Sequence, residues 1–170
     1  MTKSKIERLS AVILEFVLYS FIGWTYETVI TSISWGRFAD RGWLHLPICP
    51  IYGFCAFFLL LLIGRIKGVL PIFLSGTAVT TAAELAASYL LEIFTDERLW
   101  DYYDWKFNFD GRVSLFSSLI FGAMCVLLIK VLHPAAVKLA GKLPSPALIV
   151  TAAVMLAAIL ADIAATLAGL

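Results

Sequence analysis

Five long apolar runs dominate the sequence and decide what kind of protein the chain can be. A helix needs about 20 mainly apolar residues to cross the hydrocarbon layer of a membrane, and about 17 is the short limit. The sequence predicts spans at about residues 9–33, 47–64, 69–94, 113–132 and 147–168. We therefore expect an all-α polytopic membrane protein, a bundle of five transmembrane helices that forms a single domain over residues 1–170.

The composition is typical of a chain that is inserted in a lipid bilayer. Apolar residues make up 61% of the chain and charged residues 15%, against about 45–50% and about 25% in soluble domains. A formal net charge of +1 does not indicate a basic surface that binds nucleic acid. The three cysteines form no C-x-x-C pair, so the sequence predicts neither a disulfide scaffold nor a metal site, and no cofactor.

Basic residues indicate the orientation, because cytoplasmic loops carry an excess of Lys and Arg. We read the segment from His133 and Pro134 to Pro144 as an inner loop. With the N-terminus inside, the inner segments hold Lys3, Lys5, Arg8, Arg65, Lys67, Lys130, Lys138 and Lys142. The outer loops then hold Arg37, Arg41, Arg98, Lys106 and Arg112, interspersed with acids. This distribution predicts an N-terminus inside and a C-terminus outside.

Five carboxylates fall within the expected spans: Glu15, Glu27, Glu84, Glu92 and Asp162. A carboxylate at membrane depth costs several kcal/mol unless it is paired, protonated or wetted, so each needs a reason to be there. We expect four of them, all but Glu15, to line a polar cavity that opens to the outside.

A polar stripe runs along the span at 69–94. At 100° per residue, a sector of about 80° holds Thr77, Thr81, Glu84, Ser88 and Glu92. The stripe either hydrogen-bonds other helices and holds the bundle together, or it lines a pathway, because carboxylates in membranes mark sites.

Aromatic and cationic side chains gather on the expected outer side. All five Trp lie in the outer half or in the outer loops, which predicts a folded aromatic cap there. The same layer holds Arg37, Arg41, His45, Arg98 and Arg112. Two interpretations stay open: a pocket for an anionic or zwitterionic headgroup, or arginines that neutralise the acids in pairs.

Small residues repeat every fourth position in the last span, as Ala153, Ala157, Ala161, Ala165 and Gly169. Such a seam lets another helix approach closely. We interpret it as intramolecular packing or as the contact of a homodimer, with Asp162 facing the interior.

An ordered set of short motifs resembles a known family. The motifs are Phe-Ile-Gly-Trp-Thr-Tyr-Glu (21–27), Cys-Pro-Ile-Tyr-Gly-Phe (49–54), Glu84 with Ser88, Leu-Leu-Glu (90–92), Trp-Asp-Tyr (100–102) and Phe-Asn-Phe-Asp-Gly-Arg (107–112). Together they resemble the bacterial membrane family described as "Putative ABC-transporter type IV". The resemblance implies a bacterial cytoplasmic membrane protein, with Tyr103 standing where the family usually has Ser.

The resemblance also implies which positions are characteristic of the family: Glu27, Glu84, Glu92, Trp100, Asp101, Tyr102, Asn108, Gly111 and Arg112. Together with the buried acids, it gives our candidate binding residues: Glu27, Glu84, Ser88, Glu92, Trp100, Asp101, Tyr102, Asp104, Asn108, Arg112 and Asp162.

Three functions follow from this reading. The first is a permease-like subunit with an outward-facing acidic and aromatic cavity under a lid at residues 100–112. The chain has no G-x-x-x-x-G-K-[ST] loop, so an ATP-driven version needs a separate ATPase subunit. The second is a membrane-embedded enzyme acting on a lipid or lipid-linked substrate at the outer leaflet, with Asp101, Asp104 or Asp162 as acid or base and Arg112 as headgroup clamp. The third is a non-catalytic membrane scaffold.

Overall fold

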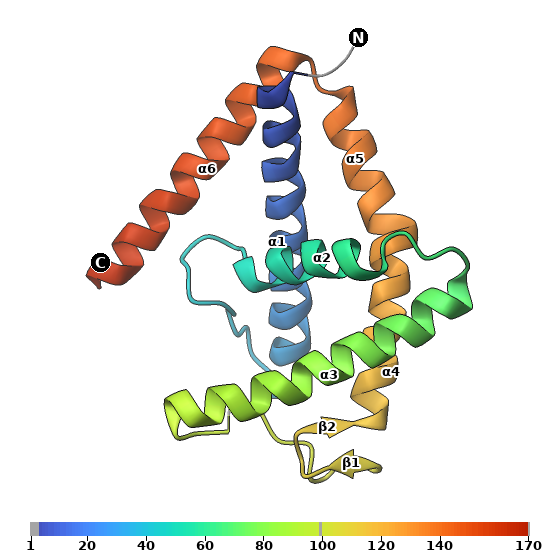
Figure 1. Cartoon of the computed structure of the whole chain (residues 1–170). Coiled ribbons are helices and arrows are strands. Elements are labelled where there is room, and N and C mark those ends of the chain that lie inside the picture. Colours follow the sequence, from blue (N-terminus) through green and yellow to red (C-terminus); the bar gives the residue numbers. More distant parts are fainter. Residues whose placement is uncertain (1–3, 99, 170) are drawn as a thin grey trace. The chain divides into compact units, whose positions relative to one another are not determined.

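Helices make up most of the chain in the computed structural model, which describes residues 4–98 and 100–169 (Figure 1). The elements in chain order are α1 (Lys5–Trp35), α2 (Pro50–Ile63), α3 (Val69–Thr95), β1 (Asn108–Phe109), β2 (Val113–Ser114), α4 (Leu115–Leu127), the π-helical turn η1 (Leu128–Leu132), α5 (His133–Lys142) and α6 (Ser145–Ala168). The two strands form a two-residue antiparallel pair. The all-α class is confirmed.

Within the described residues, four helices are long and apolar enough to cross a membrane: α1, α3, the continuous run Leu115–Lys142, and α6. The fifth apolar helix, α2, has 14 residues, fewer than the roughly 17 that a complete span requires. A membrane protein is therefore confirmed, whereas the number of spans and the orientation of the termini stay predictions.

The expected inner loop from His133 to Pro144 is wrong, because helix continues to Lys142 and α6 begins at Ser145. A proline inside an α-helix removes a hydrogen bond and clashes with the carbonyl four residues earlier, which is why Pro134 looked like a helix end. Here the wider π-helical turn η1 comes just before it and changes the hydrogen-bond register. The chain therefore stays helical across Pro134.

The helix of the second run begins at Pro50 rather than at Pro47. Residues 47–49 are non-helical, and the N–H of Cys49 donates to the carbonyl of Ser20, 3.0 Å away. Proline suits the first helical position, because the N–H that it lacks would have no partner within the helix. The run therefore divides into an irregular part and a short helix.

The chain forms two compact units, each described here by itself. The first combines Met1–Phe58 with His133–Leu170. In it α1 packs against both α5 and α6 (Figure 1). Its core includes Leu44, Ile48 and Ile159.

The second unit is Leu59–Leu132, in which α3 packs against α4. Ile63, Ile72, Cys125 and Ile129 form its core. The helix α4 begins at Leu115 because Ser114 caps it: the Ser114 hydroxyl accepts from the N–H of Ser117 at 3.0 Å.

Candidate functional site

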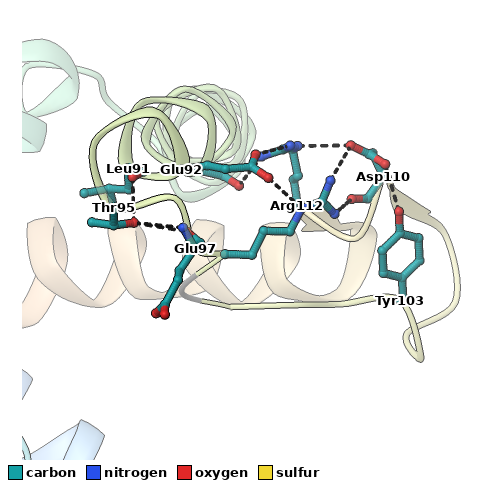
Figure 2. Close-up of polar contacts among 9 residues, drawn as sticks. Leu91, Glu92, Thr95, Glu97, Tyr103, Asp110 and Arg112 are labelled. Atoms are coloured by element: carbon teal, nitrogen blue, oxygen red, sulfur yellow. Dashed lines mark hydrogen bonds and ion pairs between the residues drawn. The ribbon is translucent and has the colours of Figure 1, made fainter.

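Arg112 fastens the loop after α3 to the end of that helix (Figure 2). Its guanidinium is buried and donates to a carboxylate oxygen of Glu92, to Asp110 at 3.0 Å and to the hydroxyl of Ser88 at 3.0 Å. It also lies 3.9 Å from the ring centre of Tyr89. All sides of this arginine are therefore occupied by groups of the second unit.

A second arginine, Arg98, completes the cluster. It donates to Glu92 at 3.3 Å and to both the carbonyl and the carboxylate of Asp110, at 3.1 and 3.3 Å. The hydroxyl of Tyr103 donates to Asp110 at 2.9 Å (Figure 2). This hydrogen bond first, and the neighbouring Arg112 guanidinium next, lower the pKa of the Asp110 carboxyl.

Three other candidate residues of this loop, Trp100, Asp101 and Asn108, hydrogen-bond to its own backbone. The indole N–H of Trp100 donates to the carbonyl of Arg112 at 3.0 Å. The Asn108 amide donates to the Trp105 carbonyl at 2.8 Å and to that of Tyr103 at 3.2 Å. Asp101 accepts from the N–H of Tyr103 at 2.8 Å. These contacts shape the turn, as the side chains of turn residues often do.

The polar stripe of α3 faces α4 and the same loop. The hydroxyl of Tyr102 donates to Glu84 at 2.8 Å, and that of Thr81 donates to Ser118 at 2.7 Å. Ser88 is one of the groups that hold Arg112. These contacts favour the packing interpretation of the stripe and the ion-pair interpretation of the arginines in this unit.

Glu27 belongs to the first compact unit, and its carboxylate has two partners there. The hydroxyl of Tyr52 donates to it at 2.6 Å, and Arg41 donates at 3.4 Å. Of the four acids expected in one cavity, Glu27 and Asp162 lie in the first unit, and Glu84 and Glu92 in the second. The structure describes each pair separately, so a cavity shared by all four stays a prediction.

Residues 36–49, which we call the return segment, run back along α1 from its C-terminal end. Hydrogen bonds join them to that helix along its length, among them Ala39 N to Ser32 at 2.9 Å, Trp24 to Asp40 at 2.8 Å, Arg41 N to Thr28 at 3.3 Å, and Cys49 N to the Ser20 carbonyl at 3.0 Å. At 1.5 Å per residue, the distance along α1 from Trp35 to Ser20 is roughly 20 Å. Irregular backbone therefore reaches the middle of the first helix, where α2 begins.

Asp162 of α6 holds this segment in place. One carboxylate oxygen accepts from the N–H of Leu46 at 2.8 Å; the other accepts from the N–H of His45 at 3.2 Å and lies 2.8 Å from its ring Nδ1. The Asp162 side chain is 8% exposed and that of His45 is 64% exposed. Asp162 therefore faces the interior, and it satisfies two backbone donors that no helix or sheet satisfies.

Sequence reasoning missed a second polar contact in this unit. The Tyr19 hydroxyl lies 2.8 Å from Nδ1 of His133, and a Glu15 oxygen lies 3.5 Å from the same nitrogen. Placing His133 in a loop hid this arrangement. Only a helix that continues through Pro134 would have placed His133 within a helix, and the sequence did not predict that continuation.

The small-residue seam of α6 is not its buried face within the described chain. Ala153, Ala157 and Ala161 are exposed, whereas Ala152 and Ile159 are buried. Intramolecular packing thus uses another face of α6, and a homodimer contact through the seam stays a prediction.

Long apolar helices that carry buried, partnered carboxylates define this chain as an integral membrane protein. The model of the family described as "Putative ABC-transporter type IV" matches residues 14–167, so the chain belongs to that family, as its motifs predicted. It is an ABC-transporter-related membrane protein. Comparisons with curated proteins and with solved structures give no match.

Proposed function

We propose that the chain is a permease-like membrane subunit of a transporter, and that the return segment with Asp162 belongs to its substrate pathway. One observation carries the proposal: the Asp162 carboxylate binds the backbone of His45 and Leu46, in a segment that ends beside the middle of α1. The membership in an ABC-transporter-related family supports it independently.

The physics of the bilayer explains why such a segment suggests a pathway. Irregular backbone at membrane depth is tolerated only where protein or a water-filled cavity satisfies its polar groups. Many transporters build their sites from interrupted helices of this kind. In this proposal the irregular residues 36–49 and the 14-residue α2 together take the place of one complete span. A carboxylate buried beside the interruption is the kind of group that marks a pathway.

Glu27 extends the proposed site, since its partner Arg41 is part of the return segment. For the loop of residues 100–112 we propose a fixed cap rather than a mobile lid. The reason is that Arg112 and Arg98 bind Glu92 and Asp110 within that unit. In this proposal Glu84, Ser88 and Glu92 support the cap and do not touch substrate.

The proposal requires a separate ATPase, because the sequence has no P-loop motif. The exposed lysines Lys138 and Lys142, near the turn between α5 and α6, offer it a basic surface on the proposed inner side of the first compact unit. A homodimer through the exposed seam of α6 would add the helices that a single chain lacks.

Purification of the full chain from its native membranes in mild detergent, followed by mass spectrometry, tests the proposal. We expect an ATP-hydrolysing subunit in near-equimolar amount, and we expect Asp162→Asn to retain that subunit while losing substrate-stimulated ATP hydrolysis. The matched variant Asp96→Asn, at the exposed end of α3, keeps both.

A different result would favour the enzyme. If the chain purifies without an ATPase, and proteoliposomes of the chain alone convert an added lipid into a product, the transporter proposal is wrong. One contact counts against Asp101 as the acid or base: its carboxylate already accepts from the N–H of Tyr103 within its own turn.

A further inference from the structure

The first compact unit contains a cavity of about 410 Å³. Residues of α1, α5 and α6 form its walls together with residues 46–48 of the return segment. Every lining residue except Glu15 is apolar. The volume lies within the range of about 300–1,000 Å³ that is usual for small-molecule sites.

The one charged lining residue, Glu15, has a partner within the protein. Its carboxylate lies 3.5 Å from Nδ1 of His133, and its side chain is 10% exposed. Glu15 is therefore largely buried beside a polar partner, and it offers a ligand little polar surface. An ion or a sugar would have to give up its hydration there without gaining hydrogen bonds, so its binding is disfavoured.

Water is an equally poor occupant. The cavity is partly open, since lining residues such as Phe21 and Leu139 are exposed, and its apolar lining offers water few hydrogen-bond partners. An empty space of several hundred cubic ångströms would also deprive its lining of dispersion contacts. In a membrane the medium around these helices is hydrocarbon, which both fits the lining and is present at high concentration.

We propose that this cavity takes an acyl chain of a bilayer phospholipid. If the chain is a transporter subunit, as proposed above, its substrate is then an amphiphile with a long hydrocarbon chain. One wall of the cavity is formed by Leu46, Pro47 and Ile48, directly after the backbone that Asp162 holds. A chain in the cavity therefore contacts the return segment itself.

Photo-crosslinking tests the binding step. The full chain is reconstituted in phosphatidylcholine vesicles that contain a phosphatidylcholine with a diazirine on one acyl chain, and the labelled peptides are mapped. We expect labels on the lining residues of α1, α5 and α6. Ala158→Phe, which fills the cavity from α6, lowers this labelling about tenfold, because an overfilled site costs enough to exclude the chain.

Two variants control the experiment. Ala164→Phe adds the same side chain at an exposed position of α6 that does not line the cavity, and it leaves the labelling unchanged. Leu139→Phe narrows the cavity from α5 and lowers the labelling as Ala158→Phe does; both positions are exposed enough to accept the change. Labels spread evenly over the exposed helix faces, or labels that neither cavity variant lowers, would overturn the inference.

The outcome separates the inference from the proposed function. Labelling of the cavity without a co-purifying ATPase leaves a lipid-binding protein that is no transporter subunit. An ATPase without labelling of the cavity leaves the transporter and removes the acyl chain as its substrate class.

Discussion

The Asp162 carboxylate accepts hydrogen bonds from two consecutive backbone N–H groups, those of His45 and Leu46. Asp162→Ala leaves both donors without an acceptor, and an unsatisfied buried donor is expensive. We expect the melting temperature of the purified protein to fall by about 5 °C or more. Asp162→Asn keeps one amide oxygen as an acceptor, so its melting temperature should fall less. Thermal unfolding in detergent, followed by intrinsic fluorescence, measures both changes.

Asp96→Asn is the control for this prediction. Asp96 ends α3 with a φ of 55°, a left-handed conformation that Asn adopts readily. Its melting temperature should equal that of the wild type. If Asp162→Ala also melts at the wild-type temperature, the carboxylate does not hold the return segment.

A pH effect is expected at Asp110, whose pKa is lowered by the Tyr103 hydroxyl and by the Arg112 guanidinium. The stabilising contribution of such a carboxylate is complete above the ordinary Asp pKa of about 3.9 and is lost as the pH falls through the lowered native value. The loop of residues 100–112 should therefore become sensitive to an acid-active protease only below about pH 4.

Tyr103→Phe removes the largest cause of this pKa shift while keeping the ring. In this variant the onset of cleavage should move to higher pH. Identical onsets in the wild type and in Tyr103→Phe would show that the hydroxyl does not stabilise the ionised Asp110.

At single residues, the sequence predicted which groups need partners but not what the partners are. Carboxylates at Glu27, Glu84, Glu92 and Asp162 are costly in apolar helices, and the structure gives each a hydrogen bond. The partner of Asp162 lies 117 residues away in the chain. Only the packing of α6 against α1 brings the two together, so no local pattern could reveal the pair.

At the scale of helices, close approach of α2 to α1 depends on Gly23. A Cβ at this position would lie 2.1 Å from Cγ of Tyr52. Gly23→Ala should therefore push the start of α2 away and lower the free energy of unfolding by about 1–3 kcal/mol. Chemical denaturation in mixed micelles measures the change.

Gly141→Ala is the matched control, because Gly141 is in α5 and a Cβ there meets nothing within 4 Å. Alanine in an open helical position should stabilise the protein by about 0.5–1 kcal/mol. Equal stabilities of the two variants would contradict the close packing of α1 and α2.

The lengths of the apolar runs predicted α1, α3 and α6 to within a few residues, since an apolar stretch of 20 or more residues has few alternatives to a helix. The predicted helix boundary was wrong where two local rules competed. Pro134 predicted a helix end, but the π-helical turn before it allowed the helix to continue. The polar residues 36–45 predicted a loop, and they are irregular and mostly exposed, but nothing local shows that they fold back along α1.

At the scale of the whole molecule, the proposed pathway depends on where the return segment lies relative to the bilayer. α6 offers a way to measure this, because Leu160 is two residues before Asp162 and is 58% exposed. His45, which contacts Asp162, is therefore at nearly the same level of α6 as an exposed residue that we expect to face lipid. A pathway predicts water at one of these positions and hydrocarbon at the other.

The decisive measurement is labelling of His45→Cys and Leu160→Cys by a membrane-impermeant thiol reagent in sealed vesicles, with the three native cysteines replaced. The account predicts that His45→Cys is labelled from one side only and that Leu160→Cys is not labelled. Labelling of both would place the return segment outside the membrane, and labelling of neither would mean that water does not enter beside it. Either result would contradict a pathway at the return segment.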